Sequence, residues 1–496
     1  MTEIDVVVAR SGEIESDTVA VAVLEPATEL PRTAAALDER AGGRLAELAR
    51  EGELTGRRDS ATVVHAEVDG ARRIAVGGLG DRDDADADAF RTAAAAVARS
   101  VKRFAGSISW LLDESLPLPL EEQARAVVDG VTLGAYEPGR WKTSGVEEPK
   151  LERLVLAGDD AGLDGPASRA AVVARWTNRA RDLSNAPANE LTPERLAEVA
   201  QELTAEQPSL SVEAIGLDRA RELGMGAFSA VAQGSQNEGR MIVIRYEPES
   251  QKGDTVLGLV GKAITFDTGG ISIKPSERME EMKHDMSGGA AVVGAMGAIA
   301  ELELPVQTIA VVAAAENMPD GGAYRPGDIL TASNGKTIEV ISTDAEGRLV
   351  LADALVYARG EGATHIVDLA TLTGAMVVAL GDLYAGVFAN DDGWRDQILA
   401  AGAASGDRVW PMPLDARYRR MIDSEYADMR NTGKWRMAGA QAGAELLREF
   451  AGEGPWAHVD IAGPASLTYG RGDYLSQKGG TGYGVRLLTE LASRLA

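Results

Sequence analysis

Two short stretches of the chain combine carboxylates, basic residues and glycines in the pattern of a metal site. The first extends over residues 262–285, and the second is Ser-Thr-Asp-Ala-Glu-Gly-Arg-Leu at residues 342–349. The candidate ligands are the carboxylates of Asp267, Asp285, Asp344 and Glu346, interleaved with Lys262, Lys274 and Arg348. Hard oxygen ligands in this number suit a pair of divalent cations better than a single one. The two stretches therefore predict a centre for two divalent cations.

The four carboxylates all lie at junctions with glycine. Asp267 ends the largely apolar run 256–266 and precedes Thr-Gly-Gly, where the backbone can approach a ligand closely. Asp285 precedes a Gly-Gly pair and a helical run. Asp344 and Glu346 are two residues apart, which in an extended segment places both side chains on one face. A single one of these residues would be read as a turn or a cap, but four of them among lysines and an arginine favour a common site.

Other hydrolytic and nucleotide-binding patterns are missing from the sequence. There is no His-Glu-x-x-His, the four histidines are scattered, and no Gly-x-Ser-x-Gly is present. The segment 258–262 hints at a phosphate loop, but its glycine spacing is wrong and Ala263 stands where Ser or Thr must bind magnesium. Serine-hydrolase and phosphate-loop chemistry are therefore not supported.

The elements that must position the candidate ligands alternate between strand and helix. Residues up to about 160 show this alternation without a catalytic signature. In the second half, strands are predicted at 241–247, 255–262, 306–315, 337–342, 366–370, 384–388 and 457–462. Helices are predicted at 288–301, 347–359, 392–404, 438–451 and 481–495. This order predicts an α/β protein whose catalytic part has a mixed sheet flanked by helices.

The same pattern divides the chain into domains. A prior of about 150 residues per domain gives two or three domains for 496 residues. We expect a smaller N-terminal α/β domain at residues 1–165, a connecting helix at 166–184 and a catalytic domain at 185–496.

Composition limits the compartment and the partners. Apolar stretches end well before about 18 residues, so no membrane span is expected, and the acidic N-terminus does not suit a signal peptide. Cysteine is absent, which favours a cytoplasmic protein. The net charge of −26 disfavours nucleic-acid binding, because a polyanion gains nothing from phosphate contacts.

The two stretches resemble the leucyl aminopeptidases of the cytosol aminopeptidase family. The resemblance rests on Lys-x4-Asp with a second Lys seven residues beyond, and on the later Thr-Asp-Ala-Glu-Gly-Arg. A similar Asn-x-Pro-x-Asn stretch, here at 185–189, begins the family's catalytic domain, and the likeness extends from there to the C-terminus. It implies a metal-dependent exopeptidase that removes the N-terminal residue, Leu-like ones preferred, from short peptides by a water that two metals activate.

The resemblance also implies roles for individual residues. The implied metal ligands are Lys262, Asp267, Asp285, Asp344 and Glu346, with Asp267 and Glu346 bridging two ions that are Mn²⁺ or Zn²⁺, with Mg²⁺ as an alternative. Lys274 and Arg348 match the family's catalytic pair, and Arg348 would anchor a bicarbonate that relays the proton. The implied substrate contacts are Thr371, Leu372 and Gly374, with Met282 lining the side-chain pocket. The family further implies a homohexamer. Ser342 departs from the usual Asn and Ala263 from the usual Gly, and neither supplies a ligand side chain.

Two alternatives remain open from the residues alone. A different dinuclear metal hydrolase, such as a phosphoesterase, would also need clustered Asp and Glu, although it would normally show more histidine ligands. A non-enzymatic acidic metal-binding protein is the other alternative.

Overall fold

The computed structural model describes residues 3–10, 16–145, 149–160, 162–435 and 437–496. The chain forms two compact units, residues 1–178 with 468–478 and residues 179–467 with 479–496. The division falls inside helix α5 (Asp164–Asn185). Residues 468–478 belong to the first unit, although they lie within the segment 185–496 that we expected to form one catalytic domain. Among the described residues, no helix combines the length and apolar character that a membrane span requires.

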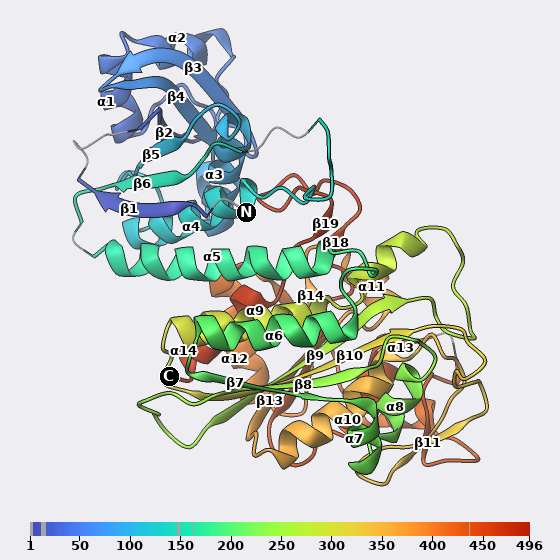
Figure 1. Ribbon diagram of the computed structural model, residues 1–496. Coiled ribbons are helices and arrows are strands. Elements are labelled where there is room, and N and C mark those ends of the chain that lie inside the picture. The colour runs from blue at the N-terminus through green and yellow to red at the C-terminus, as the bar shows by residue number, and fades with distance from the viewer. Residues whose placement is uncertain (1–2, 11–15, 146–148, 161, 436) are drawn as a thin grey trace. The chain divides into compact units, whose positions relative to one another are not determined.

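A six-stranded sheet forms the centre of the first unit, in the order β1-β6-β5-β2-β4-β3. Its strands are β1 (Asp5–Ala9), β2 (Thr18–Val23), β3 (Ala61–Val68), β4 (Ala71–Gly78), β5 (Ser107–Leu111) and β6 (Arg153–Ala157). Neighbouring strands are parallel except β3 and β4, which are antiparallel. Helices α1 (Arg32–Arg40) and α2 (Arg44–Glu51) pack on one face, and α3 (Ala87–Val101) and α4 (Leu120–Gly134) pack on the other (Figure 1).

The alternation of side chains in β2 explains these two faces. Its valines at 19, 21 and 23 belong to the core beneath α1 and α2, while its alanines at 20 and 22 belong to the core beneath α3 and α4. Successive strand residues point to opposite faces, so one short strand serves both cores. Because β2 is buried on both faces, it reads as one continuous apolar run.

The second unit is built on an eight-stranded mixed sheet in the order β15-β14-β17-β13-β9-β10-β8-β7. Its strands are β7 (Leu210–Ile215), β8 (Arg240–Tyr246), β9 (Val256–Asp267), β10 (Gln307–Asn317), β13 (His365–Ala370), β14 (Ala385–Ala389), β15 (Val409–Pro411) and β17 (Trp456–Asp460). The four central strands, β17, β13, β9 and β10, are parallel to one another. Their carboxyl ends therefore meet at one edge of the sheet, which is where ligands bind in open α/β folds.

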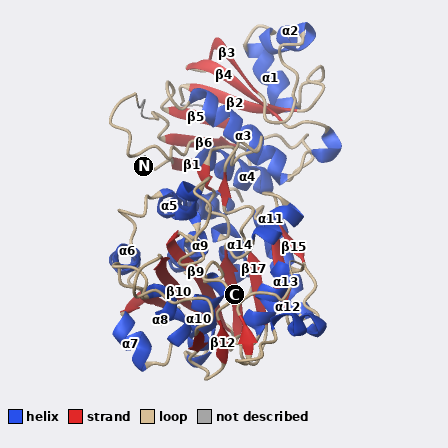
Figure 2. Ribbon diagram, turned by 90° about the vertical axis from the view of Figure 1, so that its right-hand side faces the viewer, coloured by secondary structure: helices blue, strands red, loops and turns tan. Residues whose placement is uncertain are grey.

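Helices cover both faces of this sheet. One face carries α6 (Pro193–Glu206), α9 (Ser287–Glu301), α12 (Asp392–Ser405) and α14 (Val485–Arg494). The other carries α8 (Gly226–Ala232), α10 (Gly347–Gly360) and α13 (Gly439–Arg448). Figures 1 and 2 show α9 and α14 on one side of β9 and β10, with α8 and α10 on the other. A Cβ at Gly288 would lie 2.2 Å from the Leu369 carbonyl oxygen, so the start of α9 needs glycine to pack this closely on the sheet.

Smaller elements complete the second unit. Strands β11 (Ile329–Thr331), β12 (Thr337–Glu339) and β16 (Met429–Arg430) form a three-stranded sheet, and β18 (Ser466–Leu467) pairs with β19 (Gly479–Gly480). The short helices are α7 (Leu217–Glu222), α11 (Gly374–Leu380) and the 3₁₀ turns η2 (Met279–His284) and η3 (Ala416–Ile422), with η1 (Arg82–Asp84) in the first unit.

The predicted fold class, α/β with a mixed sheet flanked by helices, is confirmed. The strands predicted at 241–247, 255–262, 306–315, 366–370, 384–388 and 457–462 correspond to β8, β9, β10, β13, β14 and β17. The strand predicted at 337–342 ends at Glu339. Helices α1, α2, α8 and α11 and strand β7 have no counterpart in the prediction, because short amphipathic or edge segments carry a weak periodic signal.

Candidate metal centre

Strand β9 carries two of the candidate ligands. It runs in the middle of the sheet, parallel to both β10 and β13, and all its residues from Leu257 to Thr265 are buried. Lys262 lies opposite Ala313 in the middle of the strand, and Asp267 is its last residue, opposite Asn317. The strand therefore buries Lys262 beneath the sheet edge and presents Asp267 at that edge.

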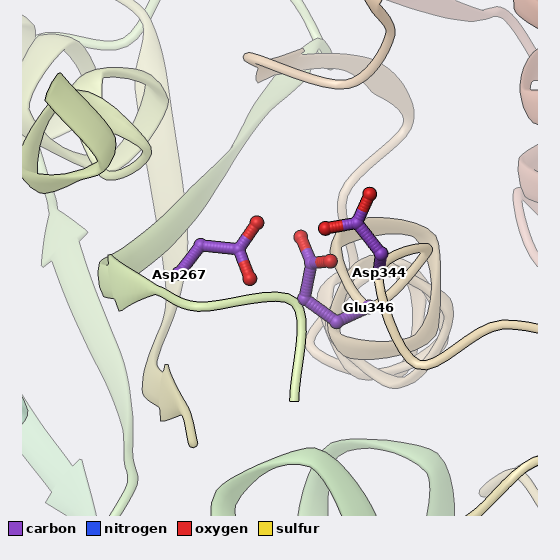
Figure 3. A group of neighbouring side chains, drawn as sticks. All are labelled: Asp267, Asp344 and Glu346. Atoms are coloured by element: carbon purple, nitrogen blue, oxygen red, sulfur yellow. The ribbon is translucent and has the colours of Figure 1, made fainter. Parts of the chain in front are cut away.

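Asp344 and Glu346 come from the segment that leads into α10. The extended conformation expected for this segment is wrong: residues 343–344 form a turn, and Glu346 has helical dihedral angles as the residue before α10. The turn nonetheless brings the two carboxylates together with Asp267. One ligand atom from each of the three lies within 4.8 Å of the others. Figure 3 shows Asp267 extending from β9 and all three carboxylates pointing toward one another.

Asp285 joins the cluster through Lys262. The Lys262 Nζ lies 2.8 Å from Asp285 Oδ2 and 2.7 Å from Glu346 Oε1, and it also donates to the Thr371 carbonyl oxygen at 3.1 Å. Lys262 and Glu346 are both nearly inaccessible to solvent. One buried ammonium group therefore links Asp285 to the carboxylates in front of α10.

Lys274 makes a second bridge on the more open side of the cluster. Its Nζ lies 2.7 Å from Asp267 Oδ2 and forms an ion pair with Asp344. The loop before it depends on Gly269, whose φ is +86° and whose Cβ would lie 2.8 Å from Asp344 Oδ1. Only glycine adopts this conformation readily and leaves room for the facing carboxylate.

Three buried polar side chains hold the Asp267 loop against the Asp344 turn. The Asn317 Nδ2 donates to Asp267 Oδ1 at 2.8 Å and to the Thr343 carbonyl oxygen at 2.9 Å. The Thr343 hydroxyl donates to the Gly269 carbonyl oxygen at 2.6 Å, and Tyr324 donates to the Thr343 carbonyl oxygen at 2.8 Å. The two loops are therefore one rigid hydrogen-bonded unit rather than two independent turns.

Burial and mutual repulsion make the cluster hold protons unusually tightly. Burial, with Glu346 adding to it, raises the pKa of Asp267 to about 6. Burial, which the charge of Lys262 opposes, raises the pKa of Asp285 to about 8. Burial disfavours the ammonium form of Lys262, but Asp285 and Glu346 outweigh it and raise the pKa of that amine. Glu346 is the exception: the two lysines overcome its burial and lower its pKa.

The cluster fits divalent cations. Four carboxylates and two ammonium groups leave a formal charge of −4 + 2 = −2 in a largely buried site. In addition, Glu346 Oε2 is buried and has no hydrogen-bond partner among the described residues. A buried carboxylate oxygen left unpaired is costly, and a cation removes that cost. An all-oxygen set with one amine suits hard or borderline metals such as Mn²⁺, Mg²⁺ and Zn²⁺.

Arg348 lies in the first turn of α10 without a carboxylate partner in the described structure. It is 8% exposed, and its Nη1 donates to the Asn431 carbonyl oxygen at 2.9 Å. Its Nε is buried and has no hydrogen-bond partner in the described part of the chain. Burial lowers the pKa of the guanidinium, although Glu346 and Asp460 oppose this effect. A guanidinium keeps its charge in proteins, so this one offers a cationic donor to a small anion.

The predicted substrate residues lie in two places. Thr371 and Leu372 are in the turn after β13, and Gly374 begins α11. The Thr371 hydroxyl donates to Asp285 Oδ1 at 2.7 Å, which places this turn directly beside the cluster. Met282 is half-buried in η2, three residues before Asp285.

Asn317 and Thr343 are not among the site residues predicted from the sequence, whereas Asp460 begins the segment 460–466, which resembles the family segment that lines the substrate pocket. Asn317 and Thr343 hold the two loops, and Asp460, at the end of β17, accepts hydrogen bonds from the 371–374 turn. Asn317 and Asp460 are the last residues of β10 and β17, although the strands predicted from the sequence are 306–315 and 457–462. A polar residue at the end of an apolar strand is the signal that singled out Asp267. That signal alone does not show which strand ends are neighbours.

Two family models match the chain. The model described as the catalytic domain of the cytosol aminopeptidase family matches residues 178–489. The model described as the N-terminal domain of the same family matches residues 20–145.

Curated proteins and solved structures agree with these models. A "Probable cytosol aminopeptidase" of Solibacter usitatus is 46% identical to this chain over 483 residues, and the match covers 97% of each chain. A "Probable cytosol aminopeptidase" of Roseiflexus castenholzii is 49% identical over 431 residues, and the match covers 85% of this chain and 86% of the relative. A mutant of tomato leucine aminopeptidase superposes with a TM-score of 0.89 at 34% identity, covering 99% of this chain and 96% of that one. The bottromycin maturation enzyme BotP in complex with Mn gives a TM-score of 0.86 at 34% identity, with 97% and 100% covered.

Proposed function

Because the chain belongs to the cytosol aminopeptidase family and is a metal-dependent aminopeptidase, we propose that its acidic cluster holds two divalent cations beside the scissile peptide bond. In this proposal Asp267 and Glu346 would serve both sites, Lys262 and Asp285 would belong to one site, and Asp344 would belong to the other. Two observations support this assignment of ligands to two sites. Lys262 contacts Asp285 and Glu346. Asp267, Asp344 and Glu346 form a second group of neighbouring carboxylates.

The proposed ions are Mn²⁺ or Zn²⁺, with Mg²⁺ as an alternative. The oxygen-rich ligand set and the Mn complex of a 34% identical neighbour support Mn²⁺. When bound, a pair of such ions supplies Lewis acidity to the scissile carbonyl and lowers the pKa of the attacking water.

Lys274 would stabilise the negative charge that develops on the carbonyl oxygen. Its ammonium group is partly exposed and already lies between Asp267 and Asp344 on the open side of the cluster. Burial lowers its pKa, but the charges of Asp267 and Glu346 outweigh burial and raise the pKa, so it stays protonated and able to donate at neutral pH. A preorganised donor at this position acts as an oxyanion donor.

Arg348 would bind a bicarbonate ion that moves the proton. Arginine is too basic to accept a proton itself. Its buried Nε without a described partner supports the binding of a small anion here. The residue's role is to hold the anion there, and the chemistry that a bound bicarbonate would supply is a proton relay.

The substrates proposed are short peptides with a free N-terminus and a Leu-like first residue. Thr371, Leu372 and Gly374 would contact the peptide, and Met282 would line the pocket for its first side chain. The turn's direct hydrogen bond to Asp285 supports this placement. A cytoplasmic homohexamer is the assembly that the family resemblance implies.

The single observation that carries the proposal is the orphaned Glu346 Oε2 among carboxylates that lie within 4.8 Å of one another. The test measures hydrolysis of leucine p-nitroanilide before and after exhaustive removal of metal, and after Mn²⁺ is restored. We expect chelation to abolish activity, Mn²⁺ to restore it, and the N-acetylated anilide to resist cleavage because it lacks the free amine.

A matched pair of variants makes the test specific. Glu346→Gln should lose activity and bound Mn²⁺, whereas Glu445→Gln, a similarly buried glutamate in α13 outside the cluster, should keep both. Full activity in the metal-free wild type, or in Glu346→Gln, would refute the proposal.

A further inference from the structure

We propose that Asp460 is a positioning residue of the reaction, whose buried carboxylate fixes the 371–374 turn against Lys262 and Asp285. The inference rests on the proposed function of that turn as the substrate-contacting segment. Among the described residues, Asp460 makes no hydrogen bond or ion pair with the acidic cluster or Arg348. Its contacts reach the site through the turn, while its charge acts on Arg348 through space.

The sheet places Asp460 beside the turn. Strands β13 and β17 are parallel neighbours, and their last residues, Ala370 and Asp460, are register partners. The Ile461 amide continues the ladder by donating to the Ala370 carbonyl oxygen at 2.8 Å. The Asp460 side chain therefore lies next to the first residues after β13.

The carboxylate accepts four hydrogen bonds, three of them from the turn. Oδ1 accepts from the amides of Leu372 at 3.2 Å, Thr373 at 3.4 Å and Ala462 at 3.2 Å, and Oδ2 accepts from the Thr373 hydroxyl at 2.6 Å. An ionised carboxylate has about four acceptor positions, and here three donors converge on Oδ1 while one binds Oδ2. Its contacts fix both the backbone of the turn and the side chain of Thr373.

The turn transmits this constraint to the cluster through Thr371. The Thr371 carbonyl oxygen accepts from Lys262 at 3.1 Å, and its hydroxyl donates to Asp285 at 2.7 Å. Leu372, the next residue, is held by Asp460. A shift of the turn would therefore move Thr371 relative to both side chains at once.

Thr373 extends the same constraint into α11. Its hydroxyl donates to Asp460 and accepts from the Met376 amide at 3.3 Å, so it is the N-cap of this helix. Gly374, another proposed substrate contact, is the first residue of α11. One carboxylate thus sets the position of every residue from 372 to the start of the helix.

The cost of the arrangement supports a role beyond folding. Asp460 is fully buried, and no lysine or arginine forms an ion pair with it in the described part of the chain. Burial raises its pKa, while His458 and the hydrogen bonds from the turn oppose the shift. A buried carboxylate without a cationic partner lowers the stability of the folded protein. Destabilising residues of this kind are expected at positions where function requires them.

The test uses full-length protein saturated with Mn²⁺ and compares kcat, KM, bound Mn²⁺ and thermal stability. Asp460→Ala should lower kcat about 10- to 100-fold, the usual range for residues that orient a catalytic group, with Mn²⁺ content unchanged. Asp460→Asn should stay within about threefold of wild type, because its amide oxygen still accepts from the turn and its amide nitrogen can donate to the Thr373 hydroxyl.

Two further variants separate positioning from folding. Thr373→Val removes the hydroxyl that donates to Asp460 and caps α11, and it should lower kcat even where Asp460→Ala fails to fold. Asp407→Asn is the control: this buried aspartate accepts from the Gly484 and Leu487 amides at the start of α14, so it should lower stability and leave kcat unchanged.

A wild-type kcat in folded Asp460→Ala would overturn the inference. If Asp460→Ala does not fold, a wild-type kcat in Thr373→Val would overturn it instead. A loss of kcat that is fully explained by lost Mn²⁺ would also overturn it. A reduced kcat with bound Mn²⁺ retained, rescued by Asn, would support it. Failure of the wild type itself to cleave leucine anilide would instead refute the proposed function.

Discussion

Asp353 should make the protein less stable as the pH rises from about 4 to about 6. The residue is fully buried in α10, where Oδ2 accepts from the Phe228 amide at 2.8 Å and Oδ1 from the Ser333 amide at 2.7 Å. Burial nevertheless outweighs these hydrogen bonds and raises its pKa from 3.8 to about 6. The folded protein therefore binds a proton in a pH range where the unfolded chain has released it.

The sign and the magnitude follow from this difference. Below pH 3.8 the carboxyl group is protonated in both states, and between 3.8 and about 6 only the folded state keeps the proton, so stability falls as the pH rises. A pKa difference of 6 − 3.8 = 2.2, at about 1.36 kcal/mol per pKa unit, corresponds to about 3 kcal/mol. Above about pH 6 this cost is complete and constant.

Urea unfolding measured from pH 4.5 to pH 7.5 tests the reasoning, with wild type compared to Asp353→Asn. The variant has no group to titrate here. The range above pH 4.5 contains about (6 − 4.5) × 1.36, or about 2 kcal/mol, of the total, so the free energy of unfolding of wild type relative to the variant should fall by about 2 kcal/mol. Asp396→Asn removes the same charge from an exposed position of α12 and should leave the pH dependence unchanged. Parallel curves for wild type and Asp353→Asn would show that burial does not raise this pKa.

Further predictions concern the site and the assembly. Lys274→Ala should lower kcat about 100- to 1000-fold with little change in bound metal, the usual loss for an oxyanion donor; unchanged turnover would remove Lys274 from the mechanism. Asn317→Ala should weaken Mn²⁺ binding about 10- to 100-fold, because Asp267 loses the donor that orients it. Equal dissociation constants for Mn²⁺ in the wild type and the variant would contradict this role of Asn317. Lys262→Met should reduce the number of protons released on metal binding, because an amine must be neutral to bind a metal. Calorimetry in buffers of different ionisation enthalpy counts the released protons, and an unchanged count would exclude Lys262 as a ligand. Light scattering at micromolar concentration should find a hexamer, and a monomer would contradict the proposed assembly.

The local features of the fold follow from the sequence. The continuous apolar runs of β9 and β10 predict strands buried on both faces, and the small-residue helix α9 predicts close packing on them, because both signals depend only on neighbouring residues. The spacing of Lys262, Asp267 and Lys274 likewise belongs to one strand and its following loop. The resemblance to the cytosol aminopeptidases could therefore be recognised before the fold was known.

The arrangement of Asp344 and Glu346 shows where local reasoning reached the right residues for the wrong reason. The sequence predicted an extended segment with both side chains on one face, whereas the structure has a turn followed by the start of α10. The two carboxylates meet because the helix start redirects Glu346 toward Asp267. Turn geometry at a helix entrance depends on the partners of the turn, which the sequence does not identify.

Only the tertiary structure decided which strand ends face one another. Asn317 reaches Asp267 across 50 residues of sequence, Thr371 reaches Asp285 across 86, and Asp460 reaches Leu372 across 88. Each of these contacts depends on the order and register of parallel strands joined by long crossover connections. Hydrophobic periodicity predicts that a strand exists but not which strand is its neighbour, so the buried polar side chains that orient the ligands and the substrate turn could be assigned only after the sheet was complete.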